Sequence, residues 1–219
     1  MSIVEKYHRV VDEVSHFSGA RLVVVVKNQS VSNIQKILDF GAHIIAFNRI
    51  QEAMEKLPLL RGDFEVHCIG HLQTNKVKKA VSLFHVIESV DSVLLAEKIG
   101  QEAEMSAKKM PVLLQVNTAN DPKKYGFSEE ELFSVLPEIQ KISGIVVQGL
   151  MTIGKQNAKE EEFRNTFQKL RGIFEKIRAK GDFGEAFREI SMGMSGDYSV
   201  ALEEGATLVR VGSLLFSSV

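Results

Sequence analysis

The sequence predicts a single (β/α)8 barrel of the TIM-barrel type, preceded by one extra helix. Three observations predict it. Short apolar runs alternate with helix-like patterns along the chain, there are eight such runs, and 219 residues leave little room for anything else. A doubly wound open sheet is the alternative, but it requires no particular number of strands. No Pro- or Ser-rich linker interrupts the pattern, so residues 1–219 are predicted to form one domain.

The leading helix is predicted from its cap and its periodicity. Ser2 and Glu5 have the spacing of a capping box. Apolar residues between Val4 and Phe17 then recur at helical intervals, and Gly19 is a typical residue to end the helix.

The eight predicted strands are short and apolar on both faces, as expected for parallel strands buried on both sides. They cover residues 22–26, 43–47, 64–70, 84–89, 112–117, 145–151, 187–192 and 206–211.

Seven predicted helices connect these strands. Capping-box spacing recurs at Ser128 and Glu131, and Gly181 follows the longest helix pattern. The first helix pattern has Ile34, Ile37 and Leu38 before Gly41, the second begins at about Asn48, and the third contains Lys76, Lys78 and Lys79. The fourth runs from about Asp91 to Ala107, and the fifth starts at Ser128. The sixth has Phe163, Phe167, Leu170, Phe174 and Ile177, and the seventh ends near Gly205.

Composition excludes several classes of protein. There are 27 Lys+Arg against 28 Asp+Glu, a net charge of −1, which argues against binding to nucleic acid or to an anionic membrane surface. The single Cys can form neither an internal disulfide nor a Cys metal cluster, so we expect a reducing, cytoplasmic setting. The N-terminal segment is not a secretory signal, and no apolar run approaches the roughly 20 residues of a membrane span.

In a barrel of this type the active site lies at the carboxyl ends of the strands. Polar residues stand at most of these ends, but no pair of carboxylates does, which disfavours glycoside hydrolysis and a hard-metal site. The residues are Lys27, Asn48, His71, Asn117, Thr152, Ser195 and Arg210.

Lys27 and Ser195 each have two interpretations. Lys27 follows four valines, so desolvation at the rim would favour its neutral amine, a nucleophile that forms Schiff bases with carbonyls. Alternatively its ammonium group simply reaches water. Ser195 and the backbone around Gly212 and Ser213 follow the last two strands, where phosphates bind in this fold. Alternatively Ser195 only caps the next helix.

The remaining candidates are also open to two interpretations. Arg210 lies within an apolar strand and requires a partner, which is a ligand or an internal ion pair. Asn48 is a helix cap or a site residue, and His71 is a strand-end histidine or a site residue. Met192 and Met194 each have the same two interpretations, lining a ligand or packing in the core. Cys68 is expected to be a small core residue.

Several segments together resemble the pyridoxal 5′-phosphate homeostasis proteins, also called the YggS/PROSC family. The longest and most specific are HCIGHLQTNKVK at 67–78 and the segment that begins SMGMSGD at 191–216. The others are VVVVK at 23–27, FNRIQEAMEK at 47–56, VLLQVNTANDPKKYGF at 112–127 and GLMTIG at 149–154. The family is similar in turn to the barrel half of alanine racemase and of bacterial-type ornithine decarboxylases, the pyridoxal phosphate enzymes of fold type III.

The resemblance implies roles for individual residues. Lys27 matches the lysine that forms a Schiff base with pyridoxal 5′-phosphate (PLP), and Arg210 matches the arginine that faces the pyridine nitrogen. Ser195, Gly212 and Ser213 match phosphate-binding positions. Asn48, His71 and Met192 match positions that line the cofactor site.

The chain also departs from the family pattern. Ala46-Phe47-Asn48 stands where Gly-Glu-Asn is usual, and Lys27-Asn28-Gln29-Ser30 stands where Lys-Thr-Lys-Pro is usual. Ser213 replaces a common Thr, and the usual Gly-x-Arg tail is absent from the C-terminal SLLFSSV.

The function that the resemblance implies is PLP homeostasis, in which the chain carries or buffers the cofactor. An Arg beside the pyridine nitrogen keeps that nitrogen unprotonated, which weakens the ring as an electron sink. Alanine racemase supplies a second base, a Tyr, from an extra domain of a partner subunit, and this chain is expected to have no such domain. We therefore expect a PLP-binding protein without a complete catalytic site. Expected partners are PLP and the apo-enzymes that use it, with no nucleic acid and no membrane, and the expected state is a monomer or weak homodimer.

Three alternatives remain open at this stage. One is a PLP-dependent amino-acid racemase, and another is a barrel aldolase that uses Lys27 on a sugar phosphate. The third is an interaction module, which leaves the converging polar residues unexplained.

Overall fold

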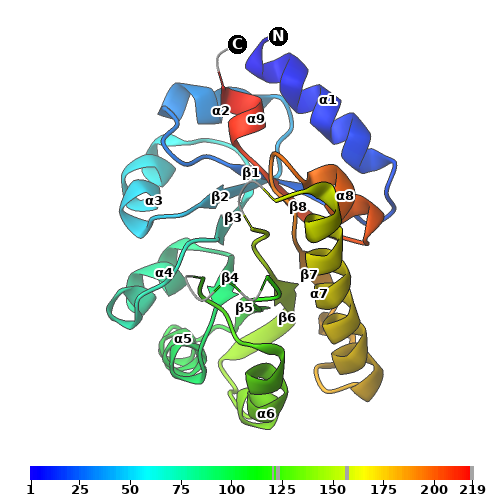
Figure 1. The fold of residues 1–219 in the computed structure, drawn as a ribbon. Coiled ribbons are helices and arrows are strands. Elements are labelled where there is room, and N and C mark those ends of the chain that lie inside the picture. The colour runs from blue at the N-terminus through cyan, green and yellow to red at the C-terminus, as the bar shows by residue number, and fades with distance from the viewer. Residues whose placement is uncertain (120, 122–123, 156–157, 218–219) are drawn as a thin grey trace.

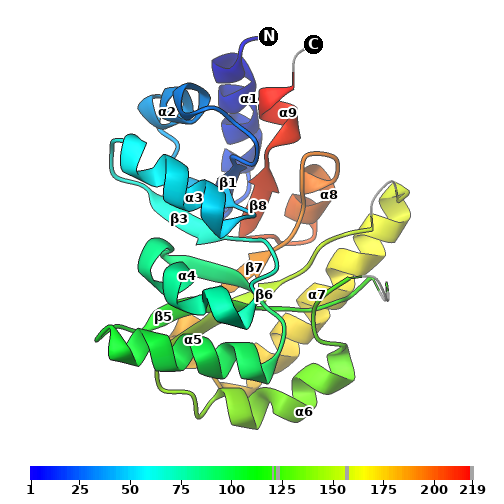
Figure 2. The same ribbon diagram turned by 90° about the vertical axis from the view of Figure 1, so that its left-hand side faces the viewer.

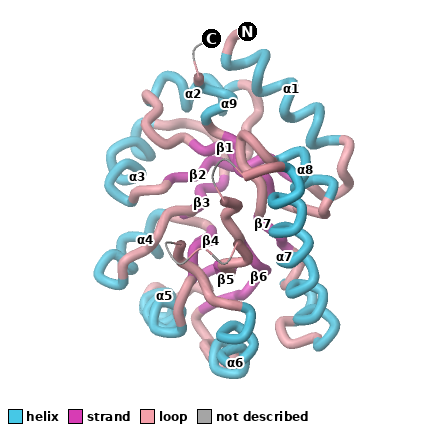
Figure 3. The backbone as a smooth tube through the Cα atoms, in the orientation of Figure 1, coloured by secondary structure: helices cyan, strands magenta, loops and turns pink. Residues whose placement is uncertain are grey.

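Eight parallel strands close into a barrel in chain order, and the pairing of β8 with β1 completes it. This computed structural model describes residues 1–119, 121, 124–155 and 158–217. Figure 3 shows the strands at the centre of the molecule with helices around them. The strands are β1 (Arg21–Val25), β2 (Ile44–Phe47), β3 (Glu65–Cys68), β4 (Val86–Val90), β5 (Met110–Gln115), β6 (Ile145–Met151), β7 (Glu189–Ser191) and β8 (Leu208–Val211).

Helices α2 to α8 connect successive strands along the outside of the barrel, whereas α1 precedes β1 and α9 follows β8 (Figure 1). The helices are α1 (Ile3–Ser15), α2 (Val31–Asp39), α3 (Ile50–Lys56), α4 (Val77–Leu83), α5 (Val93–Met105), α6 (Glu129–Ile139), α7 (Glu160–Lys180), α8 (Tyr198–Glu203) and α9 (Ser213–Phe216), with short 3-10 turns at Leu57–Leu59, Thr74–Lys76 and Gly184–Ala186.

The predicted barrel and its extra helix are confirmed, and so are several of the local signals, although α1 ends at Ser15, before Phe17 and Gly19. The capping boxes at Ser2 and Ser128 are both formed, and Gly181 ends α7 in the left-handed conformation. Cys68 is buried, as expected. Of the segments that carry the family resemblance, residues 120, 122 and 123 lie outside the described residues, as do 218 and 219 at the C-terminus.

The extra helix α1 packs beside the last helix of the chain, α9 (Figures 1 and 2). The ammonium group of Lys6 donates to the carbonyl of Ser217 at 2.6 Å, which joins the first and last elements. Tyr7, Val10 and Val14 of α1 are buried in the main core.

Apolar side chains form two separate cores. The larger lies between the strands and the surrounding helices. The smaller fills part of the barrel interior with Val23, Ile44, Ala46, Ile69, Leu113, Met151 and Leu208. Successive side chains of a strand point to opposite faces, so β1, β2, β5, β6 and β8 contribute to both cores.

Candidate functional site at the carboxyl end of the barrel

A cavity of about 700 Å³ lies at the carboxyl ends of the strands. Six of the eight predicted site residues line it, which are Lys27, Asn48, Ser195, Arg210, Gly212 and Ser213. Its lining carries four cationic side chains and one carboxylate, namely Lys27, Lys124, Lys155, Arg210 and Asp197. Such a balance favours an anionic ligand.

Lys27 follows β1 in a turn that is tied to helix α3. Asn28 adopts the left-handed conformation, with φ of 60°, which Asn tolerates better than most residues. Its backbone N–H donates to the carboxylate of Glu52 at 2.8 Å, and Lys56 donates to the carbonyl of Gln29 at 2.5 Å. Lys27 is exposed, in agreement with the interpretation that its ammonium group reaches water, and it lines the cavity.

Asn48 does not cap a helix, contrary to one of the two interpretations. Helix α3 begins at Ile50 with Arg49 at its cap position, and no side chain caps it. The amide oxygen of Asn48 is instead buried without a hydrogen-bond partner among the described residues, although Asn48 lines the cavity. Buried polar atoms are nearly always paired, so this amide is suited to a polar group of a ligand.

Gly70 allows the backbone of Asn48 to approach the end of β3. A Cβ atom at position 70 would lie 2.1 Å from the carbonyl oxygen of Asn48. A larger residue would therefore push the end of β2 out of place.

Ser195 joins the loops that follow β7 and β8, and it does not cap α8. The cap position of α8 belongs to Asp197. The hydroxyl oxygen of Ser195 accepts hydrogen bonds from the backbone N–H groups of Gly212 and Leu214, each at 3.2 Å. These two N–H groups and the hydroxyl form one cluster of donors beside the cavity, which is the donor set that phosphate oxygens require.

Arg210 forms internal contacts, as one of its two interpretations expects, and it also lines the cavity. Its Nη1 donates to the hydroxyl of Ser191 at 2.5 Å, and its Nη2 donates to the carbonyl of Thr152 at 2.7 Å. Burial lowers the pKa of Arg210, and the charges of Glu88 and Asp197 oppose that shift. A guanidinium stays protonated in proteins even so.

Sequence reasoning missed three ionisable residues of the cavity, namely Lys124, Lys155 and Asp197. Lys124 donates to the carbonyls of Ile153 and Gly154 at 3.2 and 2.6 Å, and burial lowers its pKa. Asp197 is buried, which raises its pKa, and its carboxylate accepts from the backbone N–H of Met194. Asp197 stands only two residues after Ser195, so its proximity was a usable signal, whereas Lys124 lies in a long loop whose path no local pattern fixes.

His71 and Met192 do not line the cavity. The ring of His71 stacks on Tyr125 at 3.7 Å between centroids and contacts Asp91 at 3.0 Å. Met192 is fully buried in the larger core, while Met194 lines the cavity. Ser191 points into the barrel, and the neighbouring Met192 consequently points outward to the helices.

The residues present fit a phosphorylated aldehyde that is bound through an amine. Covalent attachment of an aldehyde needs a primary amine, and Lys27 supplies one. The Ser195–Gly212 cluster supplies donors for a phosphate. Asn48 supplies a buried amide for a polar substituent. No group of three or more His, Cys, Asp or Glu side chains arranged to hold a metal ion occurs within the described part of the chain.

Comparison with known proteins identifies relatives of this chain. A family model described as the alanine racemase N-terminal domain matches residues 3–218. The pyridoxal phosphate homeostasis protein of Synechocystis sp. is 36% identical over 200 residues, which are 90% of this chain and 91% of that protein. The chain belongs to the pyridoxal phosphate homeostasis protein family. The human protein of that name is 33% identical over 207 residues, which cover 90% of this chain and 75% of the human one.

Solved structures of similar fold include a member of this family with its cofactor. The structure of PipY from Synechococcus elongatus with PLP bound has a TM-score of 0.92 and 30% identity, and covers 99% of this chain and 100% of that one. Alanine racemase of Clostridium difficile has a TM-score of 0.77 at 16% identity and matches over 56% of its own length, so that likeness concerns the fold. In the part of the chain described here, every helix is too short or too polar to span a lipid bilayer.

Proposed function

We propose that this chain binds PLP at the carboxyl end of the barrel and acts in intracellular PLP homeostasis as a carrier or buffer of the cofactor. The observation that carries the proposal is the composition of one cavity. It contains an accessible amine on Lys27, a phosphate-type donor cluster at Ser195 and Gly212, and the guanidinium of Arg210. The PLP-bound structure of PipY, a relative of nearly identical fold, supports the same assignment.

Each residue has a distinct role in this proposal. Lys27 holds the cofactor covalently when its amine condenses with the aldehyde and water leaves. Ser195, Gly212 and Ser213 hold the phosphate, and Arg210 faces the pyridine nitrogen. When bound, PLP supplies an electrophilic carbon and an electron-accepting ring.

A carrier explains the site better than an enzyme that uses a tyrosine base. Of the three tyrosines, all within the described residues, none lines the cavity. Tyr198 donates to Glu13, and burial followed by that carboxylate raises its pKa to about 12. Tyr125 stacks on His71 outside the cavity lining. The chain therefore offers no phenol that could take a proton from a bound amino acid.

The alternative function is a PLP-dependent amino-acid racemase, and one observation favours it. Lys124 brings another amine into the cavity, and burial lowers its pKa, which is the direction that a lysine acting as a general base requires. Its ammonium group is, however, already directed at the carbonyls of Ile153 and Gly154. Alanine racemization with ordinary turnover would favour this alternative over the carrier.

The experiment that tests the proposal is an absorbance spectrum of the purified protein with PLP, before and after borohydride reduction. We expect a yellow protein whose reduced cofactor is found on the peptide that contains Lys27. A protein that stays colourless with added PLP would contradict the proposal and favour an aldolase. Transfer of the bound cofactor to an apo-enzyme, measured as recovered activity, tests the carrier role.

The proposal places the protein in the cytoplasm, where a thiol such as the buried Cys68 stays reduced. Its expected recipients are apo-enzymes that use PLP. We propose a monomer or weak homodimer as its state in solution.

A further inference from the structure

A chain of polar side chains crosses the interior of the barrel, where apolar residues are usual. It begins at Arg210 in the cofactor cavity and continues through Ser191 and Glu88 to His67. These four residues come from β8, β7, β4 and β3, and each is at most 3% exposed.

The contacts of this chain are short and continuous. The Nη1 group of Arg210 donates to Ser191 at 2.5 Å, and the Ser191 hydroxyl donates to Glu88 at 2.5 Å. The other carboxylate oxygen of Glu88 lies 2.6 Å from Nδ1 of His67. Glu88 also lies 3.9 Å from Nη1 of Arg210, so one buried carboxylate faces two buried cations.

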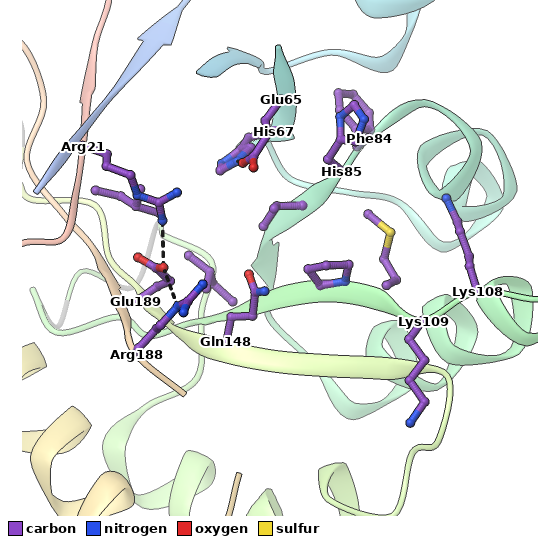
Figure 4. A pocket seen from close by; sticks show the side chains of 15 residues that line it. Arg21, Glu65, His67, Phe84, His85, Lys108, Lys109, Gln148, Arg188 and Glu189 are labelled. Atoms are coloured by element: carbon purple, nitrogen blue, oxygen red, sulfur yellow. Dashed lines mark hydrogen bonds and ion pairs between the residues drawn. The ribbon is translucent and has the colours of Figure 1, made fainter. Parts of the chain in front are cut away.

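His67 ends this chain of polar side chains, at the side of the barrel opposite the cofactor cavity. Its Nε2 lies 3.3 Å from the carboxylate of Glu65, and both residues line a second cavity of about 380 Å³ at the amino ends of the strands. Figure 4 shows Glu65 and His67 at this cavity, across from the paired Arg21, Arg188 and Glu189. Protons in solution can therefore reach His67 from the end of the barrel that lies away from the cofactor cavity.

The charge of His67 depends on this arrangement. Burial alone would lower the pKa of His67, but the carboxylates of Glu65 and Glu88 outweigh it and raise the pKa to about 9. The pKa of Glu88 is lowered: burial alone would raise it, and His67 and Arg210 outweigh that effect. The other charged or titratable groups that line the cavity are Arg21, His85, Lys108, Lys109, Arg188 and Glu189.

We propose that Glu88 and His67 are positioning residues for the cofactor, which fix Arg210 and set the positive potential that Arg210 presents to the bound ring. This inference rests on the proposed function, because it assigns to Arg210 the role of facing that ring. With His67 protonated, the charge of Glu88 is shared between two cations, and Arg210 stays strongly positive at the cavity. When His67 loses its proton, Glu88 compensates Arg210 alone, and the positive potential at the cofactor falls.

The direction of the effect follows from these signs. A ring nitrogen that accepts from Arg210 and a phosphate anion both bind better at a more positive potential. The affinity for PLP should therefore decrease as the pH rises through about 9, and the absorbance of the bound cofactor should shift over the same pH interval.

The test compares native protein with H67Q and E88Q over a pH series, with PLP as the probe. Native protein should show a step in cofactor absorbance and affinity near pH 9, and H67Q should lack that step. E88Q should also lack the step, because it removes the carboxylate through which the charge of His67 acts on Arg210. If E88Q fails to fold, H67Q and S191A carry the test.

The matched control is E189Q. Glu189 is also a buried carboxylate of the barrel interior, but it pairs with Arg21 and Thr207. We expect E189Q to keep the native step. Folded H67Q and E88Q proteins with native affinity, native spectra and an unchanged step near pH 9 would overturn the proposal.

A second experiment uses protein without cofactor and measures the protonation of His67 directly. Together with the borohydride label, it separates the positioning role from the proposed function. Nitrogen NMR of His67 should give an imidazole pKa well above 6.5 in native protein and a lower one in E88Q. If native protein gains no borohydride-stable label on Lys27, the proposed function fails. If it gains that label but the variants change neither spectrum nor affinity, only the positioning role fails.

Discussion

The hydroxyl oxygen of Ser195 lies 3.2 Å from the backbone nitrogen of Gly212, and this contact joins the loop after β7 to the loop after β8. The same oxygen accepts from the N–H of Leu214 at an equal distance. The three groups therefore hold one another in place beside the cavity before any ligand binds. A preformed set of donors requires little reordering when an anion arrives.

Ser195→Ala should weaken the retention of PLP while Lys27 still attaches it. The change removes one hydrogen-bonding group from the phosphate donors, which should cost on the order of 1–3 kcal/mol of binding free energy. Titration of the cofactor absorbance measures the loss. Ser199→Ala is the matched control, since Ser199 is exposed on α8 and should bind PLP as native protein does. Equal affinities of the S195A and S199A variants would mean that the phosphate is held elsewhere.

Lys27→Ala should abolish the covalent attachment of PLP. The phosphate donors remain in K27A, so weak, reversible binding should persist without a borohydride-stable label. Mass spectrometry of the reduced protein measures the label. Lys124→Ala is the control, because Lys124 is also an amine of the cavity. Unlike Lys27, it donates to two backbone carbonyls. A label that persists in K27A and disappears in K124A would transfer the attachment to Lys124.

Local sequence signals predicted the fold because helix ends and strands are each marked by residue types that lie close together in the sequence. Serine caps, a left-handed glycine and strands that are apolar on both faces can each be recognised within a few residues. The site required more than this. Met192 was placed in the site by the family resemblance, but it is one residue out of register with Ser191 and points outward.

The buried charges were not predictable from a local pattern. Glu88 lies in an apolar strand with its partners His67 and Ser191 at separations of 21 and 103 residues. Only the closure of the barrel brings them together. The same holds for Asn48, whose role depends on the absence of a cap contact rather than on any residue near it in sequence.

His67 should make folding stability dependent on pH in the alkaline range. Its pKa is about 9 in the folded protein, against an ordinary value of 6.5 for a histidine in an unfolded chain. The folded state binds the proton more tightly, so this stabilisation is complete below the unfolded pKa and is lost as the pH rises through the folded one. Its size should be on the order of 1–3 kcal/mol.

Urea unfolding of cofactor-free protein measures this effect. The difference in unfolding free energy between native protein and H67Q should be larger near pH 6.5 than above pH 9. His43→Gln is the control, since His43 is exposed and should show no such change. A difference between native protein and H67Q that is independent of pH would show that folding does not raise the pKa of His67.

Gly70→Ala should disturb the cofactor site without removing any group that contacts a ligand. The added Cβ would lie 2.1 Å from the carbonyl oxygen of Asn48, so the ends of β2 and β3 must separate. Overpacking of this kind typically costs about 1–3 kcal/mol of stability. Because Asn48 moves with its backbone, PLP should also bind more weakly.

Gly172→Ala is the natural counterpart, because a Cβ at that position of α7 meets no atom within 4 Å. Replacement of a glycine inside a helix should raise stability by roughly 0.5–1 kcal/mol and leave PLP affinity unchanged. Thermal unfolding and PLP titration of both variants separate a general loss of stability from a local effect on Asn48. If G70A bound PLP with native affinity, the position of Asn48 would not matter for the cofactor, and its unpartnered amide oxygen would need another explanation.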